Sequence, residues 1–212
     1  MSLLELKNIS YKYGKGDLVI KDLNLSFEAG KVYAVLGSSG SGKTTLLSLL
    51  AGLDVCLGGE IQYNGVDLKT INRDHYRAKS IGMVFQQFNL LHRYNAVDNT
   101  LIAMEISRYK TGNNKKYVKQ LLDDVGITGK KQQRKVIELS GGEQQRVAIV
   151  RAISHEPEII LADEPTGSLD ETNQSGIIEL LIKSARDNNT CIIIATHSSD
   201  VADAVDEVIR IA

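Results

Sequence analysis

The sequence predicts an α/β protein in which a mainly parallel sheet is accompanied by an antiparallel β layer and a helical insert. Three observations support this fold class. A glycine-rich stretch, residues 37–44, lies between a short apolar strand pattern and a helical pattern. Strand and helix patterns alternate toward the C-terminus, as they do where helices connect parallel strands. A long polar and basic segment with helical spacing separates these parts.

The bulk composition indicates one domain. The chain has 212 residues, of which 42% are apolar, enough for one substantial core. Its net charge of −1 creates no overall field that would attract nucleic acid or an acidic membrane. Its two cysteines, Cys56 and Cys191, are too few and too far apart for a disulfide framework or a zinc site.

The sequence shows no signal-peptide pattern at its start. It also has no apolar run that approaches the ~20 residues needed to span a bilayer. We therefore expect a cytosolic chain, or a subunit that lies peripherally on a membrane partner.

The first part of the chain predicts the antiparallel layer. Residues 3–9 partly alternate between apolar and polar, and residues 18–20 and 23–27 give two further strand patterns. Residues 60–63, followed by Asn64-Gly65, form a hairpin pattern.

The core elements begin with the strand pattern at residues 31–36. Further strand patterns lie at residues 81–85, 158–162 and 191–195. A helix is predicted over about residues 173–186, before a final helix and strand. We assign residues 1–212 to one domain with three subdomains: antiparallel β at 1–30 with 58–70, core at 31–57, 71–86 and 154–212, and helical at 87–153.

The glycine-rich stretch fits G-x-x-x-x-G-K-[ST], the pattern of a phosphate-binding loop. Its residues are Gly37, Ser38, Ser39, Gly40, Ser41, Gly42, Lys43 and Thr44. The glycines allow the backbone to approach an anion, and the loop N–H groups then face a phosphate. Lys43 adds a charge for the β- and γ-phosphates, and Thr44 offers a hydroxyl to Mg²⁺. The alternative, a turn that binds nothing, is weakened by the strand and helix on either side.

Two carboxylates, Asp163 and Glu164, end the apolar run at residues 159–162. Residues at the C-terminal end of a parallel strand commonly face a ligand crevice. Asp163 would hold Mg²⁺ beside Thr44, directly or through water. Glu164 is placed to orient or deprotonate a water aimed at the γ-phosphate. The alternative is a strand that ends in a solvated acidic turn.

A second candidate anion site lies in the stretch Leu139-Ser140-Gly141-Gly142-Glu143-Gln144-Gln145-Arg146. Ser140 can cap a helix, and Gly141 and Gly142 expose backbone N–H groups at its start. The stretch closely resembles the signature motif of ATP-binding cassette (ABC) ATPases. In that family the signature of one subunit closes over the ATP held by the other. The resemblance therefore implies a head-to-tail homodimer that sandwiches two ATP molecules.

Other residues match family motifs in the same order. The resemblance implies that Tyr13 stacks on adenine, with Tyr11 less favoured by its spacing. Gln86 matches the glutamine that contacts Mg²⁺ or water and transmits the nucleotide state to a transmembrane partner. His197 matches the histidine that contacts the γ-phosphate. Alone, each such residue would be a packing or surface residue.

Two further nucleotide contacts follow from the resemblance. Asp170 matches the acidic member of the loop that crosses the dimer seam, and Thr45 belongs with the phosphate loop. The resemblance covers essentially the whole chain and implies a phosphate-loop NTPase (RecA-like) core with ATP and Mg²⁺ as cofactors.

Three stretches narrow the resemblance: residues 52–54, 84–91 and 160–170. They look like the lipoprotein-releasing, macrolide-exporting and antimicrobial-peptide-exporting branch of bacterial ABC transporters. This implies an ATP-hydrolysing subunit that powers export or extraction of a lipophilic, peptide or antibiotic substrate. It would lie on the cytoplasmic face of the cell membrane, bound to integral membrane permease subunits.

Two other functions stay open at this point. A soluble ABC ATPase acting on nucleic acid or ribosomes is favoured only by the basic segment at residues 108–135. No nucleic-acid partner is expected, because the chain has neither a second cassette nor a long coiled-coil insertion. A nucleotide sensor that does not hydrolyse is disfavoured because both Glu164 and His197 are present.

Overall fold

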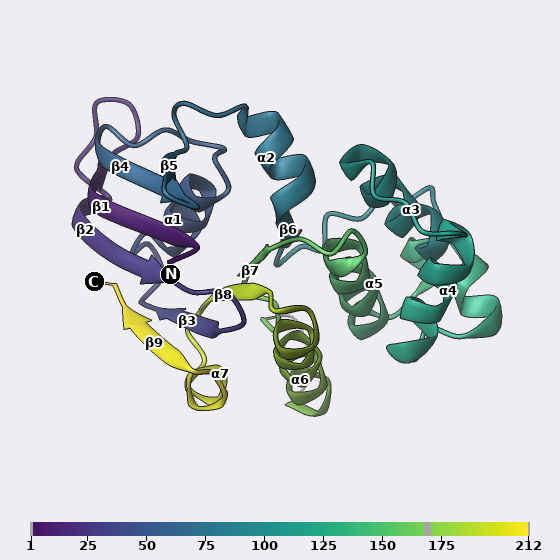
Figure 1. The fold of residues 1–212 in the computed structure, drawn as a ribbon. Helices are drawn as coiled ribbons and strands as arrows, with labels where there is room; N and C mark the ends of the chain where they lie inside the picture. Colours follow the sequence, from purple (N-terminus) through teal and green to yellow (C-terminus); the bar gives the residue numbers. More distant parts are fainter. Residues whose placement is uncertain (1, 168–170, 212) are drawn as a thin grey trace.

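The computed structural model describes residues 2–167 and 171–211, and two sheets organise them (Figure 1). A five-stranded parallel sheet has the strand order β6-β7-β8-β3-β9. Its strands are β6 (Ile81–Val84), β7 (Ile159–Asp163), β8 (Cys191–Thr196), β3 (Val32–Leu36) and β9 (Glu207–Arg210). An antiparallel sheet has the order β2-β1-β4-β5.

The parallel sheet is covered on both faces, which explains its continuous apolar strands. Every residue of β8 is buried. Ile193 packs in the cluster that contains helix α1 (Lys43–Leu50), whereas Ile192 and Ile194 pack in the cluster of helix α6 (Glu171–Asn188). Successive residues of one strand therefore belong to two different parts of the core.

The antiparallel sheet packs its apolar face on the α1 side of the core. Its strands are β1 (Leu4–Tyr11), β2 (Ile20–Phe27), β4 (Gly58–Tyr63) and β5 (Val66–Asp67). The buried residues Leu4, Leu6 and Ile61 of this sheet belong to the same cluster as α1. The predicted hairpin is confirmed, since Asn64 and Gly65, both with positive φ, connect β4 to β5.

One strand prediction is wrong. Residues 18–20 and 23–27 give two strand patterns, but the structure has one strand, β2, which begins at Ile20 and includes 23–27, while Leu18 and Val19 precede it. Asp22 has a φ of 47°, and the pairing of β2 with β1 is irregular around this position. This irregularity interrupts the alternation of side chains without ending the strand.

The helical part has its own core. Helices α3 (Ala96–Ser107), α4 (Asn114–Asp124) and α5 (Gly141–Ile153) lie together at one end of the molecule (Figure 1). Met104, Leu122 and Val147, one from each helix, are fully buried in one cluster. Two 3₁₀ turns, η1 (Gly129–Gln133) and η2 (Val136–Glu138), precede α5.

Helix α5 joins the helical part to the parallel sheet. Its Ile149 packs in the α6 cluster of the sheet, whereas Val147 packs among the helices. The contact with β6 is close at Gly82, where a Cβ atom would lie 2.4 Å from the carbonyl oxygen of Ala152. Only glycine therefore allows α5 to approach the sheet this closely.

Helix α2 (Arg73–Ser80) has no counterpart in the prediction. It has eight residues, of which only Tyr76 and Ser80 are buried, so its sequence shows no apolar stripe. Asn72 caps it by accepting a hydrogen bond from the His75 N–H. The Tyr76 hydroxyl donates to the Leu50 carbonyl and so fixes α2 to the end of α1.

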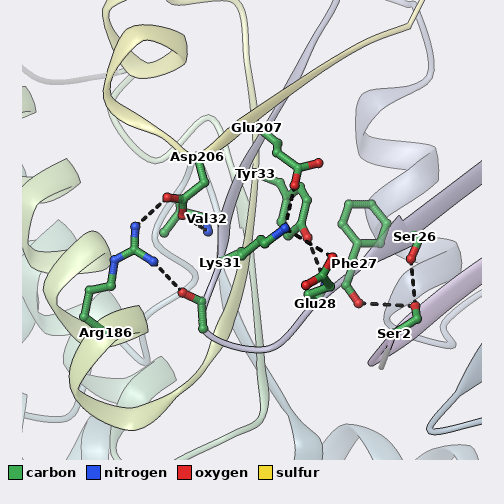
Figure 2. Close-up of polar contacts among 11 residues, drawn as sticks. Ser2, Ser26, Phe27, Glu28, Lys31, Val32, Tyr33, Arg186, Asp206 and Glu207 are labelled. Atoms are coloured by element: carbon green, nitrogen blue, oxygen red, sulfur yellow. Dashed lines mark hydrogen bonds and ion pairs between the residues drawn. The ribbon is translucent and has the colours of Figure 1, made fainter.

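An ionic network lies at the N-terminal ends of the parallel strands (Figure 2). The candidate site described below lies at their C-terminal ends. Arg186, near the end of α6, donates to the Gly30 carbonyl and to Asp206. Asp206 also accepts the Val32 N–H at 2.8 Å. Lys31 lies between Glu28 and Glu207, and hydrogen bonds to these carboxylates raise its pKa. The network links the starts of β3 and β9 to α6.

Helix α7 (Ser199–Ala204) completes the element order. Across the residues that the structure describes, no helix combines the length and the apolar character needed to cross a membrane. The division into three subdomains stays a prediction.

Candidate functional site

The candidate site lies where four neighbouring strands of the parallel sheet end. A pocket of about 470 Å³ opens there. Its lining includes residues that lie one to three positions beyond the ends of β3, β6, β7 and β8, which stand side by side in the sheet. The residues lining it are Tyr13, Val19, Ser39, Gly40, Gly42, Lys43, Thr44, Thr45, Gln86, Asp163, Glu164 and His197. The structure thus brings together residues that the sequence spreads over nearly its whole length.

The phosphate loop connects β3 to α1. Gly40 and Gly42 have φ values of 85° and 93°, a region that residues with side chains rarely adopt. The side chain of Lys43 curls back over the loop, and its Nζ donates to the carbonyls of Gly37 (2.8 Å) and Ser38 (3.1 Å). Lys43 is only 8% exposed. A fixed positive charge therefore sits at the centre of the loop.

Thr44 and Asp163 form the candidate metal pair. The Thr44 Oγ1 donates to the Asp163 Oδ2 at 2.8 Å. Burial raises the pKa of Asp163, as does the nearby charge of Glu164, while the Thr44 hydrogen bond and Lys43 act against them. A half-buried carboxylate of this kind favours a cation beside it.

The donor chemistry of this pair fits Mg²⁺. Hydroxyl and carboxylate oxygens are the hard ligands that Mg²⁺ prefers. Among the described residues, no cluster of three or more His, Cys, Asp or Glu could hold a metal ion. Mg²⁺ at Thr44 and Asp163 would therefore need further oxygens, of the kind that nucleotide phosphates and water supply.

Glu164 has an unusual backbone and a crowded carboxylate. Its φ is 44°, and its N–H donates to the Ala195 carbonyl at 2.9 Å. Its Oε1 lies 2.9 Å from the His197 Nδ1 and 3.9 Å from the Lys43 Nζ. Its Oε2 lies 3.3 Å from the Thr196 Oγ1. The two residues predicted as base and γ-phosphate contact are thus direct neighbours.

Tyr13 and Gln86 complete the predicted residues in this pocket. Tyr13 is 53% exposed and Tyr11 only 7%, so Tyr13 is the tyrosine available to a ligand. Its ring packs edge-on against Tyr11, with centroids 5.0 Å apart, and its hydroxyl lies 3.1 Å from the Thr45 Oγ1. Gln86 lies two residues beyond β6.

The second predicted anion site lies elsewhere. Ser140, Gly141 and Gly142 are not among the described residues that line the pocket. Ser140 caps α5 through its side chain and forms a capping box with Glu143. Hydrogen bonds from Lys131 and from the Ser140 backbone lower the pKa of Glu143. Asp170 lies outside the described residues.

Two contacts of the site were not predicted. Thr196 is completely buried yet reaches Glu164. Gln145 of α5 is 1% exposed, and its Nε2 donates to the Pro165 carbonyl at 2.7 Å. This bond ties the helix of the second anion site to the residue that follows Glu164. Neither contact has a sequence pattern, because each joins residues that only the fold brings together.

A family model matches most of the chain, and the relatives below are similar to it over nearly its whole length. The family model for the ABC transporter matches residues 20–167. The uncharacterized ABC transporter ATP-binding protein YclH of Bacillus subtilis (strain 168) is 41% identical, with 100% of this chain and 94% of YclH covered. The lipoprotein-releasing system ATP-binding protein LolD of Rickettsia bellii (strain RML369-C) is 39% identical, with 99% of this chain and 95% of LolD covered.

Solved structures confirm the predicted fold class. The dimeric structure of MJ0796, a bacterial ABC transporter cassette, has a TM-score of 0.88 at 32% identity, with 98% of this chain and 94% of that chain covered. A dimeric structure of MJ0796 in a post-hydrolysis state bound to ADP and Pi has a TM-score of 0.87 at the same identity and coverage.

Proposed function

This chain belongs to the ABC transporter family, and on that premise we propose that two copies hydrolyse MgATP head to tail and so power a membrane permease. The chain is an ATP-binding ABC ATPase, related to LolD and YclH. The roles of individual residues, the dimer, the permease and the substrate belong to the proposal.

The proposal depends above all on the contact between Glu164 and His197. These side chains meet at 2.9 Å at the edge of the pocket that also holds Lys43. A carboxylate beside a phosphate-binding loop can accept the proton of an attacking water. His197 and Gln86 would hold that water and the γ-phosphate in place, so that the reaction needs little reorganisation.

The loop residues would bind the nucleotide phosphates. On ATP binding the Lys43 Nζ would exchange the carbonyls of Gly37 and Ser38 for phosphate oxygens, and the loop N–H groups would donate to the same anion. Thr44 and Asp163 would hold Mg²⁺, which would supply positive charge next to the phosphates. Tyr13 would stack on the adenine ring.

The separation of the two anion sites within one chain supports the proposed dimer. Ser140–Gly142 lie exposed or half-exposed at the start of α5, away from the pocket, and so are available to a second copy. MJ0796, similar in fold over nearly its whole length, forms dimers. We therefore place the γ-phosphate of each ATP between Lys43 of one copy and Ser140–Gly142 of the other.

LolD relatives support a membrane partner and an export or extraction role. LolD is the ATP-binding protein of a lipoprotein-releasing system. By analogy, this chain would lie on the cytoplasmic face of the membrane, bound to permease subunits that carry a lipophilic, peptide or antibiotic substrate. Co-purification of the tagged chain with an integral membrane protein tests this part and separates it from an action on nucleic acid or ribosomes.

Glu164→Gln tests the proposed chemistry. The amide keeps the size of the carboxylate but accepts no proton, so turnover should fall by about 10²-fold or more. ATP binding should stay intact, and ATP-dependent dimers should accumulate in size-exclusion chromatography because hydrolysis no longer separates them. The matched control is Glu179→Gln, an exposed glutamate on α6. Near-normal hydrolysis by Glu164→Gln would refute Glu164 as the base.

A further inference from the structure

We propose that Thr196 is a positioning residue that fixes the Glu164 carboxylate and leaves Oε1 as the oxygen that receives the proton. This proposal rests on the proposed role of Glu164 as the base. Thr196 is the last residue of β8, is fully buried, and contacts the Glu164 Oε2 through its Oγ1 at 3.3 Å.

The hydrogen bonds around Thr196 set the direction of its proton. The Ser198 N–H donates to the Thr196 Oγ1 at 3.1 Å. This bond uses a lone pair of the Thr196 oxygen and leaves its single proton unused. The proton is therefore free to donate to the Glu164 Oε2. The hydroxyl therefore acts as a donor to the carboxylate, and a side chain of the same shape without a hydroxyl could not replace it.

The geometry distinguishes the two carboxylate oxygens. Oε2 is bound to the hydroxyl of a buried strand residue. Oε1 lies on the side of the phosphate loop, 3.9 Å from the Lys43 Nζ, and meets the His197 Nδ1. The partner of Oε2 is a buried residue of the sheet, whereas the His197 side chain beside Oε1 is 72% exposed and can turn aside to admit a water, so the structure assigns the proton to Oε1.

Thr196 also differs from His197 in rigidity. Thr196 belongs to β8, which is hydrogen-bonded to β7 and β3 on its two sides. The side chain of His197 is 72% exposed and can change its orientation. Glu164 holds a backbone conformation, φ 44°, that persists only when its surroundings enforce it. A fixed donor in the sheet gives this residue a constant orientation whichever way His197 turns.

Two matched variant pairs test the proposal. Thr196→Val keeps the shape and removes the hydroxyl, while Thr196→Ser keeps the hydroxyl. We expect Thr196→Val to lower kcat by roughly tenfold, which is less than the loss of the base itself would cause. The KM for ATP should change little. Thr196→Ser should retain most of the kcat. Thr196→Ala and Thr196→Ser, which both lack the methyl group, give the same comparison should the valine variant not fold.

A double-mutant cycle shows whether Thr196 acts through Glu164. Placed in Glu164→Gln, Thr196→Val should cause no further loss of the residual hydrolysis. An equal loss in both backgrounds, or an equal loss for Thr196→Ser, would overturn the proposal and indicate a purely structural role. A collapse of kcat in Glu164→Gln together with a normal kcat in Thr196→Val would overturn it while leaving Glu164 as the base. Near-normal kcat in Glu164→Gln would instead refute the base itself.

Discussion

Thr44 donates a hydrogen bond to Asp163 across 119 positions of sequence, with 2.8 Å between Oγ1 and Oδ2. The bond joins the first turn of α1 to the last residue of β7. It places the hydroxyl and the carboxylate that would hold Mg²⁺ side by side. Burial makes the ionised Asp163 carboxylate costly in the folded protein, and the same burial favours a cation beside it. The group that would bind Mg²⁺ therefore lowers the stability of the protein when no cation neutralises it.

Asp163→Asn should stabilise the nucleotide-free protein and abolish most of its Mg²⁺-dependent hydrolysis. The pKa of Asp163 is raised, so the folded state binds its proton more tightly than the unfolded chain does. The stability that this group contributes is complete below its ordinary pKa of 3.8 and is lost as the pH rises through the folded pKa. At pH 7 the variant should therefore have the higher Tm.

Thermal unfolding of the wild type and Asp163→Asn between pH 7 and pH 4 checks this sign. The difference in Tm should shrink as the pH falls. The control for the loss of a carboxylate outside the pocket is Asp124→Asn, an exposed residue on α4. A lower Tm for Asp163→Asn at pH 7 would contradict the prediction.

Lys43→Met should weaken ATP binding by roughly 30-fold or more, because a buried charged partner of the phosphates is lost. Methionine keeps most of the apolar stem of the side chain, so packing should change little. The change is measured by equilibrium titration with a fluorescent ATP analogue. Lys115→Met, an exposed lysine on α4, should bind like the wild type. Unchanged affinity in Lys43→Met would refute the phosphate-loop assignment.

Tyr13→Ala should lower ATP affinity about 5- to 150-fold, which corresponds to about 1–3 kcal/mol of lost stacking. Tyr13→Phe keeps the ring and loses only the contact of the hydroxyl with Thr45. It should therefore bind ATP nearly as well as the wild type does. Equal affinity of the alanine variant and the wild type would show that adenine does not stack there.

Ser140→Ala should destabilise the protein by about 1 kcal/mol, since it removes the cap of α5. For a chain of this size that is a fall in Tm of about 2–4 °C. Ser140→Thr keeps the capping oxygen and should restore most of the loss. A Tm of Ser140→Ala equal to that of the wild type would mean that the cap contributes nothing.

Glu143 of the same capping box should make stability depend on pH in the opposite sense from Asp163. Its pKa is lowered by Lys131 and by the Ser140 backbone. Its contribution is thus complete above its ordinary pKa of 4.5 and is lost as the pH falls through the folded pKa. Glu143→Gln should lower Tm at pH 7, and this difference should vanish in acid; a difference that persists there would point to packing rather than charge.

Much of the site could be predicted because its residues sit beside strands in the sequence. The phosphate loop, Asp163 and His197 each follow an apolar run that the pattern of side chains identifies. Once those runs form neighbouring parallel strands, their ends must meet. The fold class could be predicted for the same reason.

The parts that could not be predicted depend on contacts without local pattern. Helix α2 buries little apart from Tyr76, so hydrophobic periodicity cannot reveal it. The role of Thr196 depends on a bond to a residue 32 positions away. In the sequence Thr196 is only a hydroxyl at the end of an apolar run, and nothing there indicates where it points.

The bond from Gln145 to the Pro165 carbonyl has a kinetic consequence. In the proposed dimer, α5 of each copy presents its first turn to the neighbour's ATP. Through the Gln145 bond to Pro165, the same helix is also joined to the residue after Glu164, which would act on the ATP bound by its own copy. Binding of ATP at one site should therefore change the affinity of the other site for ATP. Turnover should then be cooperative in ATP, with a Hill coefficient between about 1 and 2. A mixed dimer with one inactive copy should then turn over at well below half the rate of the intact pair.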